Sequence, residues 1–543
     1  MIDATPSRAS WTVRAAAAAV LLLAAGCGGD GDADAASAGP LVVAYQADLQ
    51  TLNPVTSTDQ NANDAMYSLL YTPLVAFDSA YRVRPWLARS WELTDSTVTF
   101  QLRNDVRWHD GEPVDAADVA FTFRLIRDPA TASPLKPAYL ASVDSAEVLG
   151  PHRIRFRFSA DHARPLQDFF WPPVPEHLLD DVPPEQLRRH PFGREPVGSG
   201  PYRLTGWQPG EELRFRAMET FPEELGGVPA IEEVVYRILP ERTTRLRELT
   251  GGGVHVDGPL APADADQVRR DDAVRLEAFP WRMFTYLGWN TRDPRFSDAR
   301  TRRALTMALD RPALLEAALY GFGRIATGPV PPWHPHAPEV PPLPHDPDSA
   351  RSLMTAAGWR DADGDGVRER EGTEMRFELM TGQANPVHAD LVQMIQAQLE
   401  EVGVAVEPRT LEWQTVLDRH RRRDFQAVLT NWVLDSFRVD PRPLFHSDQV
   451  EVEGSANRSS YANPAADSLM EAGVRAEDPE RARRIWGELT RVLQEDQPFT
   501  FLFWNQELAG VSRELEGVEM DARGELRTLP GWRWRRDGEG SRP

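Results

Sequence analysis

Continuous and alternating apolar runs predict strands along the first half of the chain. LVVAY (41–45) is a short apolar run bounded by polar residues, which is typical of a buried strand. WELTDSTVTFQLR (91–103) and RIRFRF (153–158) alternate between apolar and polar residues, so each predicts a strand with one buried face. Further strands are predicted at YRLTGW (202–207), ELRFRAM (212–218) and EEVVYRIL (232–239).

Helical spacing of apolar residues appears between these strands and again later in the chain. Residues 63–70 have a helical pattern, and ARTRRALTMALD (299–310) has another, with Ser297 placed to cap its start. Interleaved strands and helices indicate a mixed α/β fold rather than a run of βαβ units.

The end residues of two further helices mark where they begin and stop. Asp346 is expected to cap one helix, with Pro347 in its first turn and Gly358 at its end. The other begins at Asn385 and ends at Gly403, and a strand follows. We interpret the apolar stripes of both helices as core rather than cofactor contacts.

The stretch NDVRWHDGEPVDAADVAFTF (104–123) places His109 beside Asp110, just before a glycine turn. Asp115 lies three residues before Asp118, ahead of an apolar stripe, which predicts a capped helix start. Sequence neighbours at a strand end point to opposite sides and make poor catalytic partners. We therefore expect a strand, a turn and a helix, with His109 as scaffolding.

Composition and charge restrict the class of protein. At roughly 150 residues per domain, a chain of 543 residues suggests three or four domains. The chain is 41% hydrophobic and 26% charged, as globular proteins are. A formal net charge of −22 argues against a nucleic-acid partner, because phosphates require a basic surface.

The amino terminus has the pattern of an export signal. Arg8 and Arg14 precede an apolar run at 15–25, which is too short to span a membrane. Small residues and then Cys27 follow, as in bacterial lipoprotein signals, where the thiol is acylated. The small, acidic residues 28–40 suit a flexible tether. We expect a lipid-anchored protein outside the cytoplasm, in the periplasm or at the cell surface; the alternative is a secreted protein with an incidental cysteine.

LRNDVRWHDGEPVDAADVAFTF (102–123) resembles the signature of the family 5 extracellular solute-binding proteins. These proteins are the substrate-binding subunits of peptide, nickel and related ABC importers. The resemblance extends over nearly all of the chain after the tether, and its other segments are TLNPVTSTD (51–59), YTPLVAFDS (71–79), RPWLARSWEL (84–93), PVGSGPYRL (196–204), YLGWNTRDPRFSDARTRRALTMALDR (286–311) and NWVLDSFRVDP (431–441).

The resemblance implies an α/β, two-lobed periplasmic-binding-protein-like fold of type II, similar to cluster C, with an extra domain beside the first lobe. Two crossover strands join the lobes, and ligand is enclosed by hinge closure. The implied parts are a lipoprotein signal with the acylated cysteine (1–27), a tether (28–40), the first lobe in three segments (41–75, 198–280 and 500–543, the last including a C-terminal tail), the extra domain (76–197) and the second lobe (281–499).

Dipeptide and oligopeptide binders of this family hold the peptide amino terminus with an Asp shortly after a Trp. A buried carboxylate there offsets the desolvation of the ammonium group. Here Trp432 precedes Asp435, but the Asp-Pro pair that usually follows three residues later begins five residues later, at Asp440. Asp435 and Asp440 therefore both remain candidates, and the alternative is a loop-capping residue.

Two other groups are candidates for the ligand site. Small residues before a predicted strand are expected to let the backbone approach the ligand or the hinge, unless they only form a tight turn: Gly198, Ser199 and Gly200. Three aromatic residues on cleft strands are pocket candidates, each with a core position as the alternative: Tyr45, Trp281 and Trp289.

DADGDGVRERE (361–371) resembles a calcium loop. Asp361, Asp363 and Asp365 occupy its first, third and fifth positions. The twelfth position should be a bidentate Glu and is Gly372. The segment is a candidate for a structural calcium ion, and the alternative is an acidic surface turn.

The resemblance implies a monomeric substrate-binding lipoprotein that captures a peptide or similar small solute and delivers it to the permease of an ABC importer. It implies no enzymatic activity and no required cofactor. A metal chelate or an oligosaccharide is the alternative ligand, and a secreted hydrolase is the remote alternative function. A hydrolase needs a nucleophile with a base or a metal cage, and GSG is not a nucleophile elbow because position 197 is Val.

Overall fold

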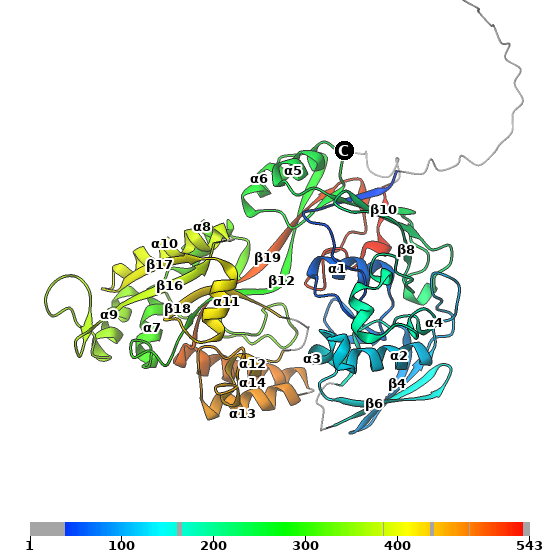
Figure 1. The fold of residues 1–543 in the computed structure, drawn as a ribbon. Helices are drawn as coiled ribbons and strands as arrows, with labels where there is room; N and C mark the ends of the chain where they lie inside the picture. Colours follow the sequence, from blue (N-terminus) through cyan, green and yellow to red (C-terminus); the bar gives the residue numbers. More distant parts are fainter. Residues whose placement is uncertain (1–38, 160–164, 384, 435–438, 477, 536–543) are drawn as a thin grey trace, which may run out of the picture. The chain divides into compact units, whose positions relative to one another are not determined.

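The computed structural model describes residues 39–159, 165–383, 385–434, 439–476 and 478–535 (Figure 1). All of the elements below belong to the unit Pro40–Pro543. Among these described residues, none of the helices has the length and apolar character required to cross a membrane.

An 11-stranded mixed sheet dominates the fold, in the order β17-β16-β18-β12-β19-β11-β1-β10-β9-β8, with β13 also paired to β19. Its strands are β1 (Leu41–Tyr45), β8 (Tyr202–Gln208), β9 (Glu212–Ala217), β10 (Glu233–Ile238), β11 (Val256–Asp257), β12 (Val274–Trp289), β13 (Gly323–Ile325), β16 (Arg376–Gly382), β17 (Ala405–Leu411), β18 (Ala427–Val433) and β19 (Phe499–Ser512).

The long strands β12 and β19 pair antiparallel, and Figure 1 shows them side by side in green and orange-red. Beyond β19 the sheet continues through β11 to β8, and beyond β12 it continues through β18 to β17. Strands from the three segments predicted as the first lobe therefore pair with one another in this sheet. The predicted boundaries of the domains stay predictions. The β12–β19 register shifts between Pro280 and Phe284, and such irregularities re-aim side chains.

A second, four-stranded sheet has the order β4-β5-β7-β6. The prediction of a single strand at 91–103 is wrong. This run contributes to two strands, the end of β4 and the whole of β5. A tight turn separates them, in which the N–H of Thr94 donates to the carbonyl of Thr97 at 2.8 Å. The strands of this sheet and of the small hairpins are β2 (Val75–Phe77), β3 (Val83–Pro85), β4 (Ala88–Leu93), β5 (Thr97–Leu102), β6 (Val143–Gly150), β7 (Arg153–Phe158), β14 (Glu369–Arg370), β15 (Thr373–Glu374), β20 (Leu515–Glu516) and β21 (Arg533–Trp534).

The helices lie between these strands in the sequence. The predicted helix at 63–70 is the end of α1 and a π-helical segment, Ala65–Leu70. The α-helices are α1 (Gln60–Asp64), α2 (Ala116–Arg127), α3 (Leu135–Tyr139), α4 (Glu176–Leu179), α5 (Arg242–Thr250), α6 (Ala265–Arg269), α7 (Ala299–Met307), α8 (Arg311–Leu319), α9 (Pro347–Ala356), α10 (Pro386–Glu400), α11 (Trp413–Arg421), α12 (Arg442–Phe445), α13 (Pro464–Arg475) and α14 (Pro479–Asp496).

Most of the predicted helix ends are confirmed. Asp115 and Asp118 form a reciprocal capping box at the start of α2. Asp346 accepts the N–H of Ser349 at the start of α9, and Gly358 follows that helix with φ +92°. Only glycine adopts such a backbone conformation without strain, so it stops the helix there.

The predicted cap of α7 is wrong by one residue. The side chain of Asp298 accepts the N–H of Arg300 at 2.8 Å. The hydroxyl of Ser297 instead donates to the carbonyl of Pro294 at 3.0 Å. An ionised carboxylate also complements the helix dipole, which a hydroxyl does not.

The largest hydrophobic core is shared by both sheets and α2. Val43 of β1 and Tyr236 of β10 belong to the same buried cluster as Phe100 of β5, Phe156 of β7 and Val119 of α2. The segments predicted as the first lobe and as the extra domain therefore bury apolar surface together.

Candidate functional site

A cavity of about 240 Å³ lies where the C-terminal end of β1 meets α1, β12 and β19. Three of its lining residues are acidic and two are aromatic: Asp64, Glu507, Glu525, Tyr45 and Trp281. No Lys, Arg or His is among the lining residues. The cavity is therefore a polar, electronegative recess with an aromatic wall.

The three carboxylates of the cavity form no hydrogen bond or ion pair with any described side chain. Oε1 of Glu525 is fully buried and has no hydrogen-bond partner. Since burying an unpaired carboxylate is costly, such groups ordinarily bind a cation or hold a proton.

Burial raises the pKa of all three carboxylates. The pKa of Asp64 is raised to about 6, against the opposing charges of Arg527 and Arg282. The pKa of Glu507 is raised to about 8 by burial and by the charge of Asp64. Burial, with the charges of Asp64 and Glu507, raises the pKa of Glu525 well above its usual range.

Two glycines let these carboxylates approach the backbone. A Cβ placed on Gly258 would lie 2.3 Å from Oε1 of Glu525. A Cβ on Gly524 would lie 2.6 Å from Oδ1 of Asp64. Asp64, Glu507 and Glu525, which are far apart in the sequence, thus all line the same cavity.

Tyr45 is the aromatic residue at the end of β1. The residue is 9% exposed, and its ring stacks on that of Tyr236, with ring centroids 4.5 Å apart. Burial raises the pKa of both phenols, so they remain neutral. Tyr45 therefore offers the cavity an uncharged aromatic surface.

A half-buried histidine, His109, positions the helix that carries Asp64. Nδ1 of His109 accepts the N–H of Gly198 at 3.1 Å, so its Nε2 carries the proton and donates to the carbonyl of Gly200 at 3.1 Å. The N–H groups of Ser199 and Gly200 donate to the carbonyl of Leu70, at 2.9 and 2.8 Å. Leu70 ends the π-helical segment that continues α1, so residues 198–200 hold α1 in place.

The family model described as "Bacterial extracellular solute-binding proteins, family 5 Middle" matches residues 82–449. The chain belongs to family 5 of the bacterial extracellular solute-binding proteins. It is therefore a solute-binding protein, and the predicted membership is confirmed.

Two curated relatives of this family 5 protein match along most of its length. The oligopeptide-binding protein AppA of Bacillus subtilis is 27% identical over 511 residues, covering 91% of each chain. The dipeptide-binding protein of Escherichia coli is 25% identical over 521 residues, covering 90% of this chain and 93% of the other.

A solved structure is similar in fold. AppA of Bacillus subtilis in complex with a nonapeptide has a TM-score of 0.73 and 26% identity, and covers 92% of this chain and 99% of its own. The α/β, two-lobed periplasmic-binding-protein fold of family 5 is thus confirmed for this chain.

Of the predicted aromatic residues of this family 5 chain, two line the cavity and one does not. Tyr45 and Trp281 are on its wall. Trp289 is fully buried in the core beside Phe296, and its indole N–H donates to the hydroxyl of Thr500 at 3.1 Å. The alternative stated for Trp289, a core aromatic, is the one that the structure favours.

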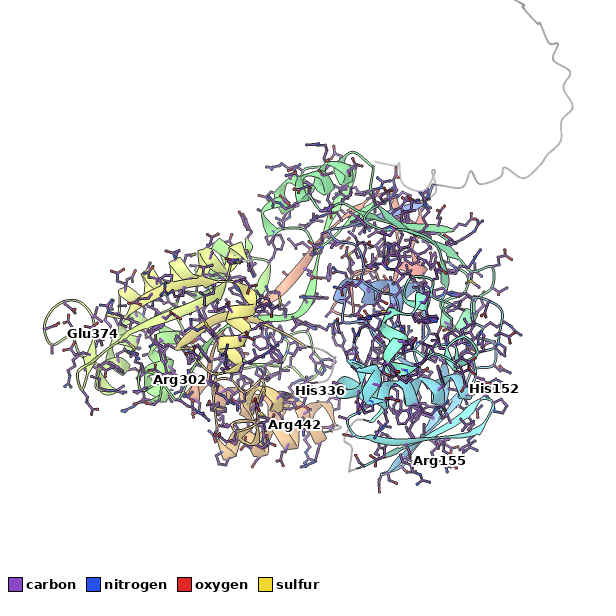
Figure 2. The ribbon with its side chains drawn as sticks, in the orientation of Figure 1. His152, Arg155, Arg302, His336, Glu374 and Arg442 are labelled. Carbon is purple, nitrogen blue, oxygen red and sulfur yellow. The ribbon has the colours of Figure 1, made fainter. Side chains whose placement is uncertain are left out.

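The residues predicted to hold a peptide amino terminus lie on or after β18. Trp432 is half-buried opposite Phe284 of β12. Asp435 lies outside the described residues. Asp440 forms an ion pair of 2.6 Å with Arg442. Arg442, the first residue of α12, is labelled in Figure 2. Neither Trp432 nor Asp440 lines the cavity, and the peptide-binding role of all three stays a prediction.

The glycine-rich turn is explained by packing. A Cβ on Gly198 would lie 1.9 Å from the carbonyl oxygen of Leu70, and one on Gly200 would lie 2.2 Å from that of Leu69. No side chain fits at either position. None of residues 198–200 lines the cavity, so their contact with ligand remains a prediction.

His109 and Asp110 have separate partners, which confirms the expectation of scaffolding. Asp110 is bound to the Nε2 of His177 at 2.9 Å, while His109 binds the glycine-rich turn. Burial lowers the pKa of His109 to about 4, so the ring is neutral at pH 7.

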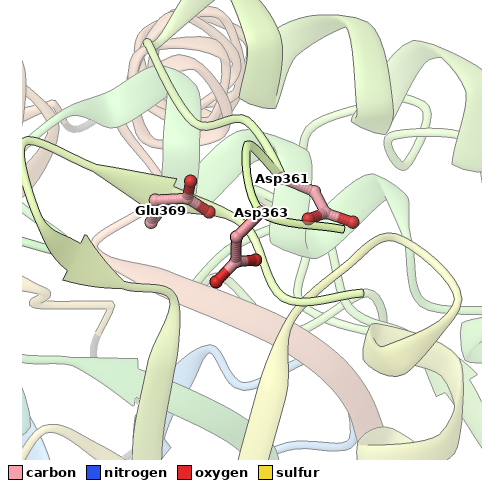
Figure 3. Close-up of side chains that lie close together, drawn as sticks. All are labelled: Asp361, Asp363 and Glu369. Atoms are coloured by element: carbon pink, nitrogen blue, oxygen red, sulfur yellow. The ribbon is translucent and has the colours of Figure 1, made fainter. Parts of the chain in front are cut away.

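The acidic loop after α9 brings three carboxylates together, as Figure 3 shows. Ligand atoms of Asp361, Asp363 and Glu369 lie within 4.8 Å of one another. Asp365, predicted as the third ligand, is not in this group, and its Oδ1 accepts the N–H of Val367 at 2.8 Å. The calcium ion stays a prediction, and Glu369 stands in this group where Asp365 was predicted.

The acidic residues of the cavity were missed in the sequence. One signal could have found Glu507: it is the single charged residue in the apolar run FLFWNQELAGV of β19. Asp64 and Glu525 lie in polar stretches, where nothing in the local pattern separates them from surface acids.

Proposed function

We propose that this chain is the substrate-binding subunit of an ABC importer, that it captures peptides outside the cytoplasm, and that it delivers them to a membrane permease. It binds its ligand without chemical turnover. It acts as a monomer anchored to the membrane through a lipid on Cys27.

The observation that carries this proposal is the likeness to peptide binders along nearly the whole chain. Relatives named for oligopeptide and dipeptide binding align with 91% and 90% of its length. An extended peptide can bind through its backbone to strand edges whatever its side chains are, which suits a broad importer.

Capture follows from the difference between two states of the protein. A ligand that contacts both lobes binds the closed state more tightly than the open one and shifts the population toward it. The permease then recognises the closed, loaded form.

The first experiment measures the thermal midpoint of the purified protein with di- to hexapeptides, oligosaccharides and metal chelates. A ligand that binds only the folded state raises the midpoint. We expect peptides alone to raise it. A higher midpoint with a sugar or a chelate, and no change with peptides, would agree with the family 5 fold but would show that the ligand is not a peptide.

The same assay locates the residue that holds the peptide amino terminus. Asp435→Asn is expected to weaken peptide binding at least tenfold. The matched control is Asp418→Asn on α11, an exposed residue, which should leave binding unchanged. Loss of binding in Asp440→Asn, with Asp435→Asn unaffected, would transfer the role to Asp440.

The anchor has its own test. Cells that express the full chain are grown with a radiolabelled fatty acid, and the protein is compared with a Cys27→Ser variant. We expect label and membrane attachment in the first and neither in the second. A chain that is released into the medium unlabelled would be a secreted protein with an incidental cysteine.

A further inference from the structure

The lining of the acidic cavity contains acidic side chains without a basic side chain beside them. Its lining contains three carboxylates and no basic residue. Arg527 is close enough to lower the pKa of Asp64, but it donates to the carbonyl of Tyr67, and its guanidinium lies over the ring of Phe170 at 5.4 Å. Neither Arg527 nor Arg282 lines the cavity.

A second observation points to an occupant. Oε1 of Glu525 is fully buried and accepts no hydrogen bond, and the residue Glu525 is part of the cavity lining. A buried acceptor without a donor costs about 1–3 kcal/mol, and more when it is charged. Glu525 packs closely against Gly258, and no described group of the protein supplies the missing donor.

The three carboxylates of the cavity are not grouped as the ligands of one metal ion. Ligands of calcium lie roughly 2.3–2.6 Å from the ion, so any two of them are at most about 5 Å apart. Among the described residues, only Asp361, Asp363 and Glu369 bring three such atoms within 4.8 Å of one another. The cavity carboxylates are therefore spread too widely for one ion to bind all of them.

A guanidinium or ammonium group at the end of an aliphatic stem fits the same cavity. A guanidinium presents five N–H donors in a planar fork and can reach several separate carboxylates. The stem can pack on aromatic rings such as those of Tyr45 and Trp281, while the charge points toward the acids. A volume of about 240 Å³ is far larger than a lone ion or a single water requires.

From this geometry we infer that the cavity of Asp64, Glu507 and Glu525 binds the basic side chain of a captured peptide, so that the protein prefers peptides containing arginine or lysine. This inference rests on the proposed function, because it names the substrate class of that importer. It assigns the preference to residues of α1, of β19 and of the segment after β20.

The test compares arginine with its neutral analogue citrulline, which has nearly the same shape. Alanine tetrapeptides with arginine at one of the four positions are titrated by calorimetry into the purified protein, and the citrulline set is titrated in parallel. We expect at least tenfold tighter binding of arginine at one position. Glu525→Gln and Glu507→Gln should abolish that preference.

The matched control is Glu407→Gln, an exposed carboxylate on β17 outside the cavity, which should keep the preference. The thermal midpoint of each variant without ligand shows that it is folded.

Proton release gives a second test, because a purely structural role of the carboxylates would not produce it. Binding a cation at pH 7.5 should expel protons from Glu507, so the apparent enthalpy should depend on the ionisation enthalpy of the buffer.

Agmatine, a small alkylguanidine, separates failure of the inference from failure of the proposed function. Equal binding of arginine and citrulline peptides would overturn the cavity inference and leave peptide capture intact. If no peptide binds but agmatine does, and Glu525→Gln abolishes its binding, peptide capture is overturned and the cation site stands. If neither peptides nor agmatine bind, both proposals fall.

Discussion

Nδ1 of His109 accepts the backbone N–H of Gly198 at 3.1 Å, so an imidazole on one segment fixes the turn that holds α1. His109→Asn should therefore lower the free energy of unfolding by about 1–3 kcal/mol, since buried backbone groups lose their partners. Denaturant titration measures the change. The control His345→Asn alters a partly exposed ring and should cost little. An unchanged free energy for His109→Asn would contradict this role.

The same histidine makes a pH-dependent contribution. Its folded-state pKa is about 4, below the usual 6.5, because burial opposes the charged form. Below pH 6.5 the unfolded state binds the proton first, so the wild type loses stability as the pH falls toward 4. The deficit of His109→Asn relative to the wild type should shrink over that interval. A constant deficit from pH 7 to pH 4.5 would show that His109 is not held neutral.

Glu507 should act in the opposite direction. Its folded-state pKa is raised from 4.5 to about 8, so the folded state holds a proton that the unfolded state has lost. Stability is therefore lost as the pH rises from 4.5 through 8, by an amount on the order of a few kcal/mol. Glu507→Gln should gain stability relative to the wild type at pH 8 but not at pH 4.5. Denaturant titrations without ligand at the two pH values measure this, and an equal difference at both would reject it.

A methyl group at position 198 should disrupt the support of α1. A Cβ there would lie 1.9 Å from the carbonyl oxygen of Leu70, and neither backbone can move freely. Overpacking of this kind costs roughly 1–3 kcal/mol, and more where backbone meets backbone. Gly206→Ala on β8 is the control, because its Cβ would meet nothing within 4 Å. Equal midpoints for the two variants would show that the close approach is not required.

Calcium should raise the thermal midpoint if the acidic loop binds it, and a chelator should reverse the rise. Asp361→Asn should abolish the effect, because Asp361 is one of the three grouped carboxylates. Its two oxygens also accept the N–H groups of Gly364 and Gly366 within the loop. Asp365→Asn is the control, because Asp365 is not part of that group. An identical midpoint with calcium and with chelator would identify the segment as an acidic surface turn.

Local sequence signals predicted local structure well. LVVAY became β1, and the caps at Asp115, Asp346 and Asn385 lie where their side chains predicted them. These features depend on residues a few positions apart. The hairpin within 91–103 was missed because alternation continues through its turn and hides the reversal.

The site was much harder to predict, because its residues meet only through long-range pairing. Tyr45 could be named because it ends an obvious strand. Asp64 and Glu525 become neighbours only when the last part of the chain packs against α1, and no local pattern records that contact. Trp281 and Trp289 belong to the same strand, β12, yet Trp289 lies in the core and Trp281 on the cavity, and neither position is marked in the local sequence.

The place of β19 in the large sheet constrains the order in which the protein can be made. Val43 of β1 pairs with Val256 of β11, which pairs in turn with Val511 of β19. A ribosome delivers β11 and β12 long before it delivers β19, so the edges of these two strands that face β19 stay unpaired until then. Vectorial folding from the amino terminus cannot complete this sheet. A chain that stops before β19 leaves the facing edges of β12 and β11 unpaired, so the two halves of the large sheet join only once residues 499–512 have been added.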